Sequence, residues 1–178
     1  MPSSSSPDRT TFRRAHSVLV VDDNPSMKYA VARHLRAGGY NTVEASGGAE
    51  ALELSEFVSA VVLDVHLPDV DGFEVCRLLR ARESTARLPV IHMSAVRMEE
   101  ADALAAAESG GDGFLVAPVN PVELTTTLDR LLTREAGAGS GTARSGHAED
   151  AQSPGARSGA GLRSILEQMT AGEKTRGR

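Results

Sequence analysis

Aromatic residues and cysteine are scarce in this chain of 178 residues. Aromatics make up 3% of it and Trp is absent, so we expect an aliphatic core and no aromatic platform for stacking single-stranded nucleic acid. The single cysteine, Cys76, excludes an internal disulfide and a multi-cysteine metal site, and it fits a reducing compartment. Cys76 lies on an apolar helical stripe, which predicts a core residue.

Long apolar runs are also absent. The first 16 residues contain no apolar run that could serve as a secretion signal, and no stretch approaches the ~18 apolar residues that a membrane span needs. The sequence therefore predicts a cytoplasmic protein with no membrane association.

Positive charge is lacking in the middle of the chain. Residues 17–134 carry ten basic and eighteen acidic side chains, a net charge of −8, whereas residues 1–16 carry +2 and residues 135–178 carry +1. DNA-binding domains usually carry a basic surface that binds phosphates, and a segment with this net negative charge is not expected to bind DNA directly.

Both ends of the chain lack an extended periodic pattern. Residues 1–16 are expected to be disordered, and residues 135–160, rich in Gly, Ala and Ser, are expected to form a flexible linker because they contain no Leu, Ile, Val or aromatic residue. Residues 161–171 are either a short amphipathic helix that docks on a partner or a segment only marginally helical alone, and residues 172–178 are expected to be disordered. The apolar positions of that short segment are Leu162, Ile165, Leu166 and Met169.

Between these ends, five short apolar runs alternate with helical patterns. The runs at 17–22, 60–64 and 88–93 are almost continuously β-branched or aliphatic, as expected of strands buried on both faces. The run at 41–45 is more polar and suits an edge strand, and the fifth run covers 112–116.

Helix signals separate the runs: an N-cap residue followed by a proline or by a Glu three residues on, and a closing pair of glycines. Five strands that alternate with five helices predict an α/β domain over residues 17–134, a doubly wound parallel sheet covered on both faces. The expected helices run from Pro25 to the Gly38–Gly39 pair, near 48–57, from Asp71, near 97–109 and from Asn120.

Acidic side chains follow two of the buried runs. Asp22 and Asp23 end the first run, Asp64 ends the third, and Ser94 follows the fourth. Because the carboxyl ends of parallel strands share one edge of the sheet, these side chains should converge. Two carboxylates ~4 Å apart repel by roughly 4 kcal/mol at an effective dielectric of about 20. Mg²⁺, which binds through a few carboxylates plus phosphoryl oxygens, would relieve that repulsion.

Four motifs stand out in residues 17–134: VLVVDDNPSM (18–27), VVLDVHLPDVDGFEV (61–75), VIHMSA (90–95) and GGDGFLVAPVNPVEL (110–124). With these motifs and their spacing, the segment resembles the receiver domain of two-component response regulators. The resemblance implies a flavodoxin-like sheet in the order 2-1-3-4-5, with the run at 41–45 on an edge.

The resemblance also implies roles for single residues. Asp64 matches the phosphoacceptor, Ser94 the switch hydroxyl that bonds the phosphoryl group, and Phe114 the switch aromatic. The implied ligands of Mg²⁺ are Asp22, Asp23, Asp64 and the backbone carbonyl of His66.

The function implied by the resemblance is that of a single-domain response regulator. It would take a phosphoryl group from a histidine kinase or a phosphotransfer protein and signal through contacts with an unidentified protein partner. Apart from slow autodephosphorylation, no enzymatic activity is expected.

One position departs from the family pattern. The family has a Lys immediately before the proline of the loop after the fifth strand, where this chain has Ala117. The site is therefore one positive charge short, and His66 and Arg97 are the residues near it in sequence that could compensate. The Ala117–Pro118 bond is expected to be cis, as the family's Lys–Pro bond commonly is.

Other functions stay open. A pseudo-receiver would keep the fold and the acids but act as a binding module without phosphorylation. A phosphohydrolase of the haloacid dehalogenase type also uses an Asp at a strand end, but it needs a second Asp two residues on, where this chain has His66. A flavodoxin is less favoured, because the turn after the first strand is acidic where a phosphate cradle would be rich in glycine or hydroxyls.

Overall fold

The computed structural model describes residues 8–95 and 100–139. The predictions for the amphipathic segment at 161–171, the chain end at 172–178 and most of the linker lie outside the described residues, as does Arg97. Within the described part, none of the helices combines the length and apolar composition required to cross a bilayer.

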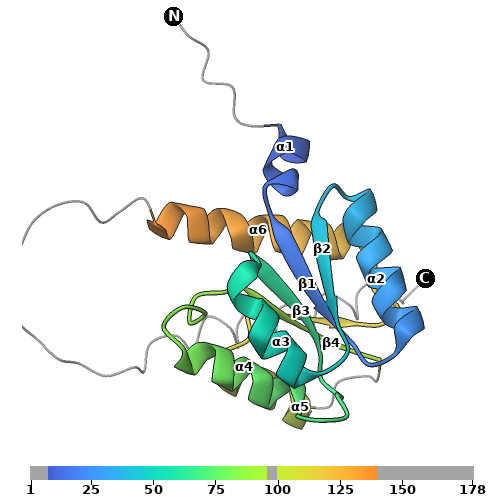
Figure 1. Ribbon diagram of the computed structural model, residues 1–178, viewed down its shortest axis with the longest axis vertical. Helices are drawn as coiled ribbons and strands as arrows, with labels where there is room; N and C mark the ends of the chain where they lie inside the picture. The colour runs from blue at the N-terminus through green and yellow to red at the C-terminus, as the bar shows by residue number, and fades with distance from the viewer. Residues whose placement is uncertain (1–7, 96–99, 140–178) are drawn as a thin grey trace, which may run out of the picture.

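The centre of the domain is a parallel sheet of five strands in the order β2-β1-β3-β4-β5, which confirms the predicted topology (Figure 1). The polar run at 41–45 forms the edge strand β2, as expected, and β5 forms the other edge. The strands are β1 (Ser17–Val21), β2 (Asn41–Ala45), β3 (Ala60–Asp64), β4 (Val90–Ser94) and β5 (Gly113–Val116).

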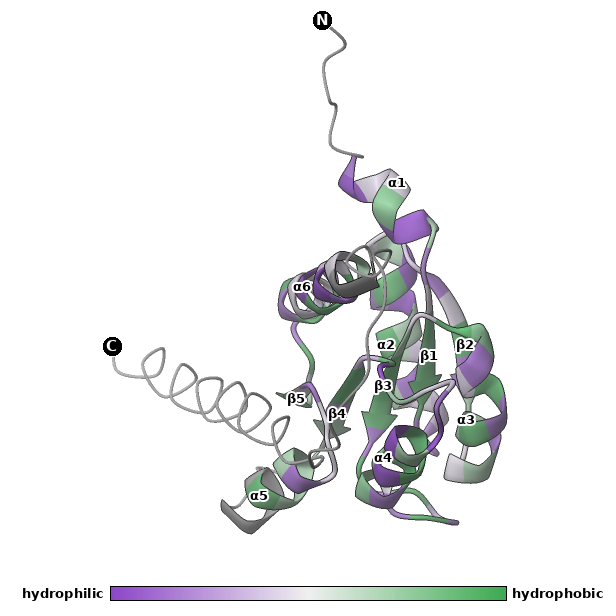
Figure 2. Cartoon of the chain, turned by 90° about the vertical axis from the view of Figure 1, so that its left-hand side faces the viewer, coloured by the Kyte–Doolittle hydropathy of each residue, from purple (hydrophilic) through white to green (hydrophobic). Residues whose placement is uncertain are grey.

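Helices cover both faces of the sheet. Apolar side chains of α2 and α6 pack with alternate residues of β1, β3, β4 and β5 on one face, while α3 and α4 pack on the opposite face. Figure 2 shows the apolar strands between these helices. The helices are α2 (Pro25–Ala37), α3 (Gly48–Leu54), the 3-10 turn η1 (Ser55–Phe57), α4 (Gly72–Ala81), α5 (Glu100–Glu108) and α6 (Pro121–Gly139).

Local capping explains where three of these helices begin. The side chain of Asn24 accepts hydrogen bonds from the backbone N–H groups of Ser26 and Met27 at the start of α2, and Pro25 is its first residue. Asp71 caps α4 and Asn120 caps α6 in the same way. The predicted helix starts are confirmed here.

The core is aliphatic, as the composition predicts. All buried residues of β1 and β3 are Val, Leu or Ala, and most are fully inaccessible to solvent. Cys76 is buried in the cluster formed by α3, α4 and the sheet, which confirms its assignment to the core.

The N-terminal segment departs from the prediction. We expected residues 1–16 to be disordered, but Arg9–Arg14 form a short helix, α1, directly before β1. Its Arg13 forms an ion pair with Asp129 of α6 (Nη2 to Oδ2, 2.6 Å) and donates a hydrogen bond to the carbonyl of Gly38 (2.9 Å). Both partners lie far away in sequence, so local composition gives no sign of them.

The C-terminal boundary was also misplaced. We expected the domain to end at residue 134 and a linker to begin at 135, but α6 continues to Gly139. Extending a helix by one residue adds a hydrogen bond without the cost of nucleation. Glu135, Ala136 and Ala138 have high helix propensity, whereas Gly137 and Gly139 oppose the extension, so composition alone did not predict this turn.

Candidate functional site

Three carboxylates meet at the carboxyl end of the sheet, as predicted. Val21 of β1 pairs with Leu63 of β3, so Asp22, which follows β1, and Asp64, the last residue of β3, stand side by side. Together with Asp23 they offer carboxylate oxygens that all lie within 4.8 Å of one another. Asp22 is buried, Asp64 is partly buried and Asp23 is exposed, so the group opens to solvent on one side.

The protein environment makes two of these carboxylates resist ionisation. Burial, followed by the charge of Asp22, raises the pKa of Asp64 to about 6, against the opposing effect of the backbone N–H groups of His66 and Val65. Burial also raises the pKa of Asp22, and the nearby charge of Asp23 adds to it. The hydrogen bond from the Asn24 N–H to Asp22 Oδ1 (2.8 Å) opposes that rise. A cation would relieve both effects.

This arrangement fits a magnesium ion. The donors are hard oxygen atoms, they are close enough to share one ion, and the exposed side leaves room for water or phosphoryl oxygens. The pKa of Asp64 is raised first by burial and then by the charge of Asp22, and a bound cation would oppose both causes. The fourth implied ligand, the carbonyl of His66, belongs to the loop that leaves β3, and its role stays a prediction.

A glycine makes the close approach of this loop possible. Gly72, the first residue of α4, donates its N–H to the carbonyl of Val65 (2.9 Å). A Cβ at Gly72 would collide with the backbone carbonyl oxygen of Asp64. Substituting Gly72 would therefore push α4 away from the end of β3 and disturb the backbone next to Asp64.

Ser94 and Phe114 lie on the neighbouring strands. Ser94 ends β4 and is buried, and its carbonyl accepts a hydrogen bond from the N–H of Ala117 (2.8 Å). Phe114 of β5 is buried against Val65 of the β3–α4 loop and against α4 and α5. The structure thus brings Ser94 to the carboxylate edge and places Phe114 beneath it, while their switching roles stay predictions.

Ala117 itself brings no positive charge to the β5 side of the site. The Ala117–Pro118 bond is cis, as predicted. Among the described residues Lys28 is the only lysine, and it lies on α2 at the opposite, β2 side, where its Nζ donates to the hydroxyl of Ser46. The exposed His66 is close enough that its charge lowers the pKa of Asp64, although burial outweighs this effect.

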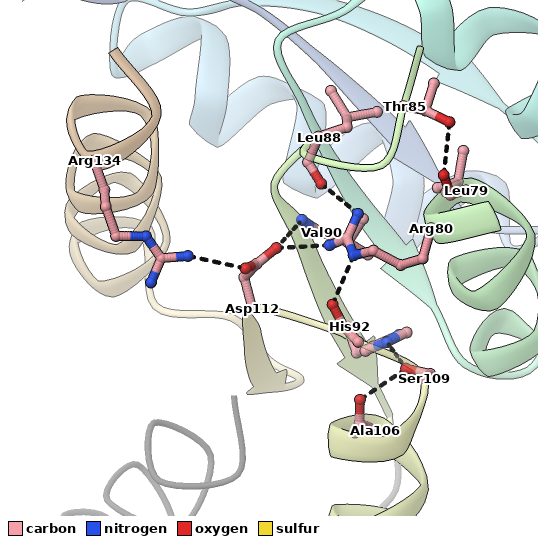
Figure 3. A network of polar contacts seen from close by, with 11 residues as sticks. Leu79, Arg80, Thr85, Leu88, Val90, His92, Ala106, Ser109, Asp112 and Arg134 are labelled. Atoms are coloured by element: carbon pink, nitrogen blue, oxygen red, sulfur yellow. Dashed lines mark hydrogen bonds and ion pairs between the residues drawn. The ribbon is translucent and has the colours of Figure 1, made fainter. Parts of the chain in front are cut away.

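A partly buried polar network at the start of β4 and β5 could not be seen in the sequence (Figure 3). Arg80 of α4 donates to Asp112 Oδ2 (2.8 Å) and to the carbonyls of Gly110 (2.9 Å) and Leu88 (2.8 Å). Arg134 of α6 reaches the other oxygen of Asp112 (3.2 Å). Helices from opposite faces of the sheet are thereby joined at the start of β5.

His92 of β4 is fully buried beside this network, and burial lowers its pKa to about 3. The hydroxyl of Ser109 donates to the carbonyl of Ala106 (2.7 Å), so it accepts a hydrogen bond from Nε2–H of His92 (3.0 Å). A histidine inside an apolar strand run is the only sequence signal for this contact. It is a structural contact that fastens α5 to β4.

Comparison with known proteins agrees with this geometry. A family model described as the response regulator receiver domain matches residues 18–129. Among curated proteins, the chain is 35% identical over 120 residues to the transcriptional regulatory protein GltR of Pseudomonas aeruginosa, covering 66% of this chain and 49% of that protein. It is 34% identical over 120 residues to the transcriptional regulatory protein AfsQ1 of Streptomyces coelicolor, covering 66% and 52%.

Solved structures show the same fold. The chemotaxis protein CheY4 of Vibrio cholerae superposes with a TM-score of 0.61 at 29% identity, covering 65% of this chain and 98% of that one. The receiver domain of the Francisella response regulator 1452 gives a TM-score of 0.61 at 28% identity, covering 67% and 98%. The chain spans about half the length of the curated relatives it matches, but nearly all of these receiver structures.

Proposed function

This chain belongs to the response regulator receiver domain family, and we propose that its Asp64 accepts a phosphoryl group from a histidine kinase or a phosphotransfer protein. The observation that carries the proposal is the group of three carboxylates at the carboxyl end of β1 and β3, with oxygens within 4.8 Å of one another. Receiver domains act in signal transduction, and the transfer would be the input step.

The transfer is a substitution at phosphorus. An oxygen of Asp64 forms a new P–O bond, the N–P bond of the partner's phosphohistidine breaks, and its electron pair stays on the histidine nitrogen. Asp64 must be ionised to attack, yet burial raises its pKa to about 6. Mg²⁺ held by Asp22, Asp23, Asp64 and the carbonyl of His66 would supply charge neutralisation for the carboxylate and the phosphoryl oxygens.

The other site residues have distinct tasks in this proposal. The hydroxyl of Ser94, at the end of β4, donates a hydrogen bond to a phosphoryl oxygen. Phe114 packs in the cluster between β5, α4 and α5, so a rearrangement of these elements on phosphorylation would change its packing. The phosphorylated form then signals through contacts with a protein partner in the cytoplasm, and slow autodephosphorylation ends the signal.

A second function, the pseudo-receiver, is favoured by one observation. Ala117 cannot pair with Asp64 or with a phosphoryl oxygen, so a contact that would distinguish the two states of the switch is lost. A domain of this kind would bind its partner without being phosphorylated on Asp64.

Mass spectrometry of the intact protein separates these functions. After incubation with acetyl phosphate and Mg²⁺, we expect one added phosphoryl group on the wild type and none on Asp64→Asn. Asp23→Ala should lose Mg²⁺ binding in a calorimetric titration while keeping its fold. If the wild type gains no phosphoryl group, the phosphoacceptor proposal is wrong and the pseudo-receiver is preferred; unchanged Mg²⁺ affinity in Asp23→Ala would refute the metal assignment.

A further inference from the structure

The β3–α4 loop, residues 65–71, connects Asp64 to α4 and carries the predicted carbonyl ligand of His66. Its first residue, Val65, is fixed at both polar backbone groups: its N–H donates to the carbonyl of Met93 (3.0 Å), and its carbonyl accepts from Gly72 (2.9 Å). The start of the loop is therefore anchored to β4, and the bond from Gly72 joins it to the first residue of α4, where the loop ends.

The outer tip of this loop is attached to a different element. Asp69 accepts hydrogen bonds from two successive backbone N–H groups at the start of α3, Gly48 to Oδ1 and Ala49 to Oδ2, both 2.9 Å long. Both carboxylate oxygens are thus engaged by the first turn of α3. These bonds hold the pKa of Asp69 below its usual value, so the side chain is ionised at neutral pH.

Two glycines let the loops come this close. A Cβ at Gly47 would lie only 3.0 Å from Oδ2 of Asp69, and a Cβ at Gly48 would collide with the side chains of Val70 and Val75. The contact between the two loops is therefore backbone against side chain, with little room for slippage. Val70 also packs against the core cluster of α3 and α4, which seats the loop on the apolar face below it.

The β2–α3 loop is bonded on its other side as well. Ser46, two residues before Gly48, accepts a hydrogen bond from Nζ of Lys28 on α2. Helix α2 begins directly after the loop that contains Asp23. Residues 46–49 are therefore hydrogen-bonded on one side to α2, which follows the loop containing Asp23, and on the other side to Asp69 of the β3–α4 loop.

We propose that Asp69 is a positioning residue for the metal site: by fastening the tip of the β3–α4 loop to α3, it holds the carbonyl of His66 in place as a ligand. The inference rests on the proposed function, because it needs a site for Mg²⁺. Groups that orient a metal ligand without touching the ion commonly change metal affinity by ten-fold or more when they are removed. Without the two bonds from Gly48 and Ala49, each metal-binding event must also order the loop.

The test measures Mg²⁺ affinity in the full chain by following amide NMR signals during a MgCl₂ titration. Asp69→Ala removes both acceptors and should raise the Kd about ten-fold. Asp69→Asn keeps one acceptor oxygen and should restore part of the affinity. The matched control is Glu53→Ala. It removes one exposed acidic side chain from α3, the helix that Asp69 contacts, and should change the Kd less than two-fold.

Ionic strength separates positioning from charge. The titrations are run in about 0.3 M KCl, where the screening length of about 6 Å suppresses the loss of one remote negative charge. Far-UV circular dichroism and the strand amide signals show that each variant is folded before metal is added. In Asp69→Ala the amide signals of His66 and Ala49 should also shift before metal is added, because the bonds between the loops are lost.

The outcomes distinguish this inference from the proposed function. If the wild type binds Mg²⁺ and Asp69→Ala binds it equally well, the positioning role is refuted while the metal site stands. Equal losses in Asp69→Ala, Asp69→Asn and Glu53→Ala would also refute it, since charge alone would then explain the effect. If the wild type does not bind Mg²⁺, the proposed metal site itself is wrong.

Discussion

Replacing Asp64 with Asn should stabilise the metal-free protein at neutral pH. Burial raises the pKa of Asp64 from 3.8 to about 6, so the folded protein holds this proton more tightly than the unfolded chain does. Between about pH 4 and pH 6 the folded state therefore binds more protons, and the free energy of unfolding falls as the pH rises. Above pH 6 the carboxylate is charged in both states and the penalty is complete. Asn removes it.

The size of the effect follows from the same shift. The difference between 3.8 and about 6 corresponds to about 3 kcal/mol if it is expressed in full. Asp64 is only partly buried, and water screens part of the repulsion from Asp22. We therefore expect Asp64→Asn to raise the free energy of unfolding by about 1–2 kcal/mol at pH 7.5, and by nothing measurable at pH 3.5, where the wild-type carboxyl is protonated in the folded state.

Urea unfolding followed by far-UV circular dichroism measures this difference, because the chain has no Trp. Both proteins are unfolded in EDTA at pH 3.5, 5, 6 and 7.5. Asp69→Asn is the control of opposite sign: hydrogen bonds lower the pKa of Asp69, so its loss should destabilise the protein at pH 7.5 and matter less as the pH falls below 4. A variant no more stable than the wild type at pH 7.5 would refute the reasoning, and so would a gain that persists unchanged at pH 3.5.

Three further outcomes are expected. Arg13→Ala should lower the free energy of unfolding by about 2 kcal/mol, because it removes charged hydrogen bonds to Asp129 and to the end of α2; a double-mutant cycle with Asp129→Asn that shows no coupling would contradict this. Ala117→Lys should enlarge the amide shifts that beryllofluoride causes in the loops after β4 and β5, since a charged contact to the phosphoryl mimic is gained; equal shifts in both proteins would mean that another residue already has this role. Residues 140–160 should exchange their amide hydrogens without protection, because they have little apolar area to bury, and protection like that of the central strands would overturn the linker prediction.

The sheet was predictable because its central strands, β1, β3 and β4, are buried on both faces. The continuous aliphatic runs at β1 and β3 must be buried, and the interior of a parallel sheet buries both faces of a strand. The βαβ alternation then allows few topologies. The errors are small and physical. The predicted strand at 88–93 begins two residues too early: Pro89 has no N–H to donate to the ladder, and β4 begins at Val90. The helix expected at 48–57 tightens into a 3-10 turn for its last three residues, Ser55–Phe57.

The carboxylate group was predictable for a related reason. Once the strand order is known, the parallel pairing of β1 with β3 brings Asp22 next to Asp64 without any knowledge of side-chain conformation. Contacts that depend on loop conformation could not be found in this way. Asp69 reaches the amides of Gly48 and Ala49 from 20 residues away, and only the fold shows that these loops touch.

The same limit explains the N-terminal error. Residues 1–16 read as polar and unpatterned, and a six-residue helix is not stable alone. What stabilises α1 is tertiary: Arg13 stacks over the ring of Tyr40 and pairs with Asp129, which also accepts a hydrogen bond from the Tyr40 hydroxyl (2.6 Å). The tertiary contacts of one arginine outweigh the low intrinsic helix stability of this segment, and no hydrophobic periodicity in the sequence indicates them.

The energetics of the carboxylate group connect stability to function. A site that raises the pKa of Asp64 to about 6 destabilises the metal-free fold at neutral pH, and a bound cation removes that cost. The free energy that the fold loses at this edge is therefore available to metal and phosphoryl binding. Ala117 brings no ammonium group to the β5 side, so the proposed site would depend more on the metal for this neutralisation. In this chain the occupancy of the site by Mg²⁺, more than a protein cation, should decide how readily Asp64 is phosphorylated.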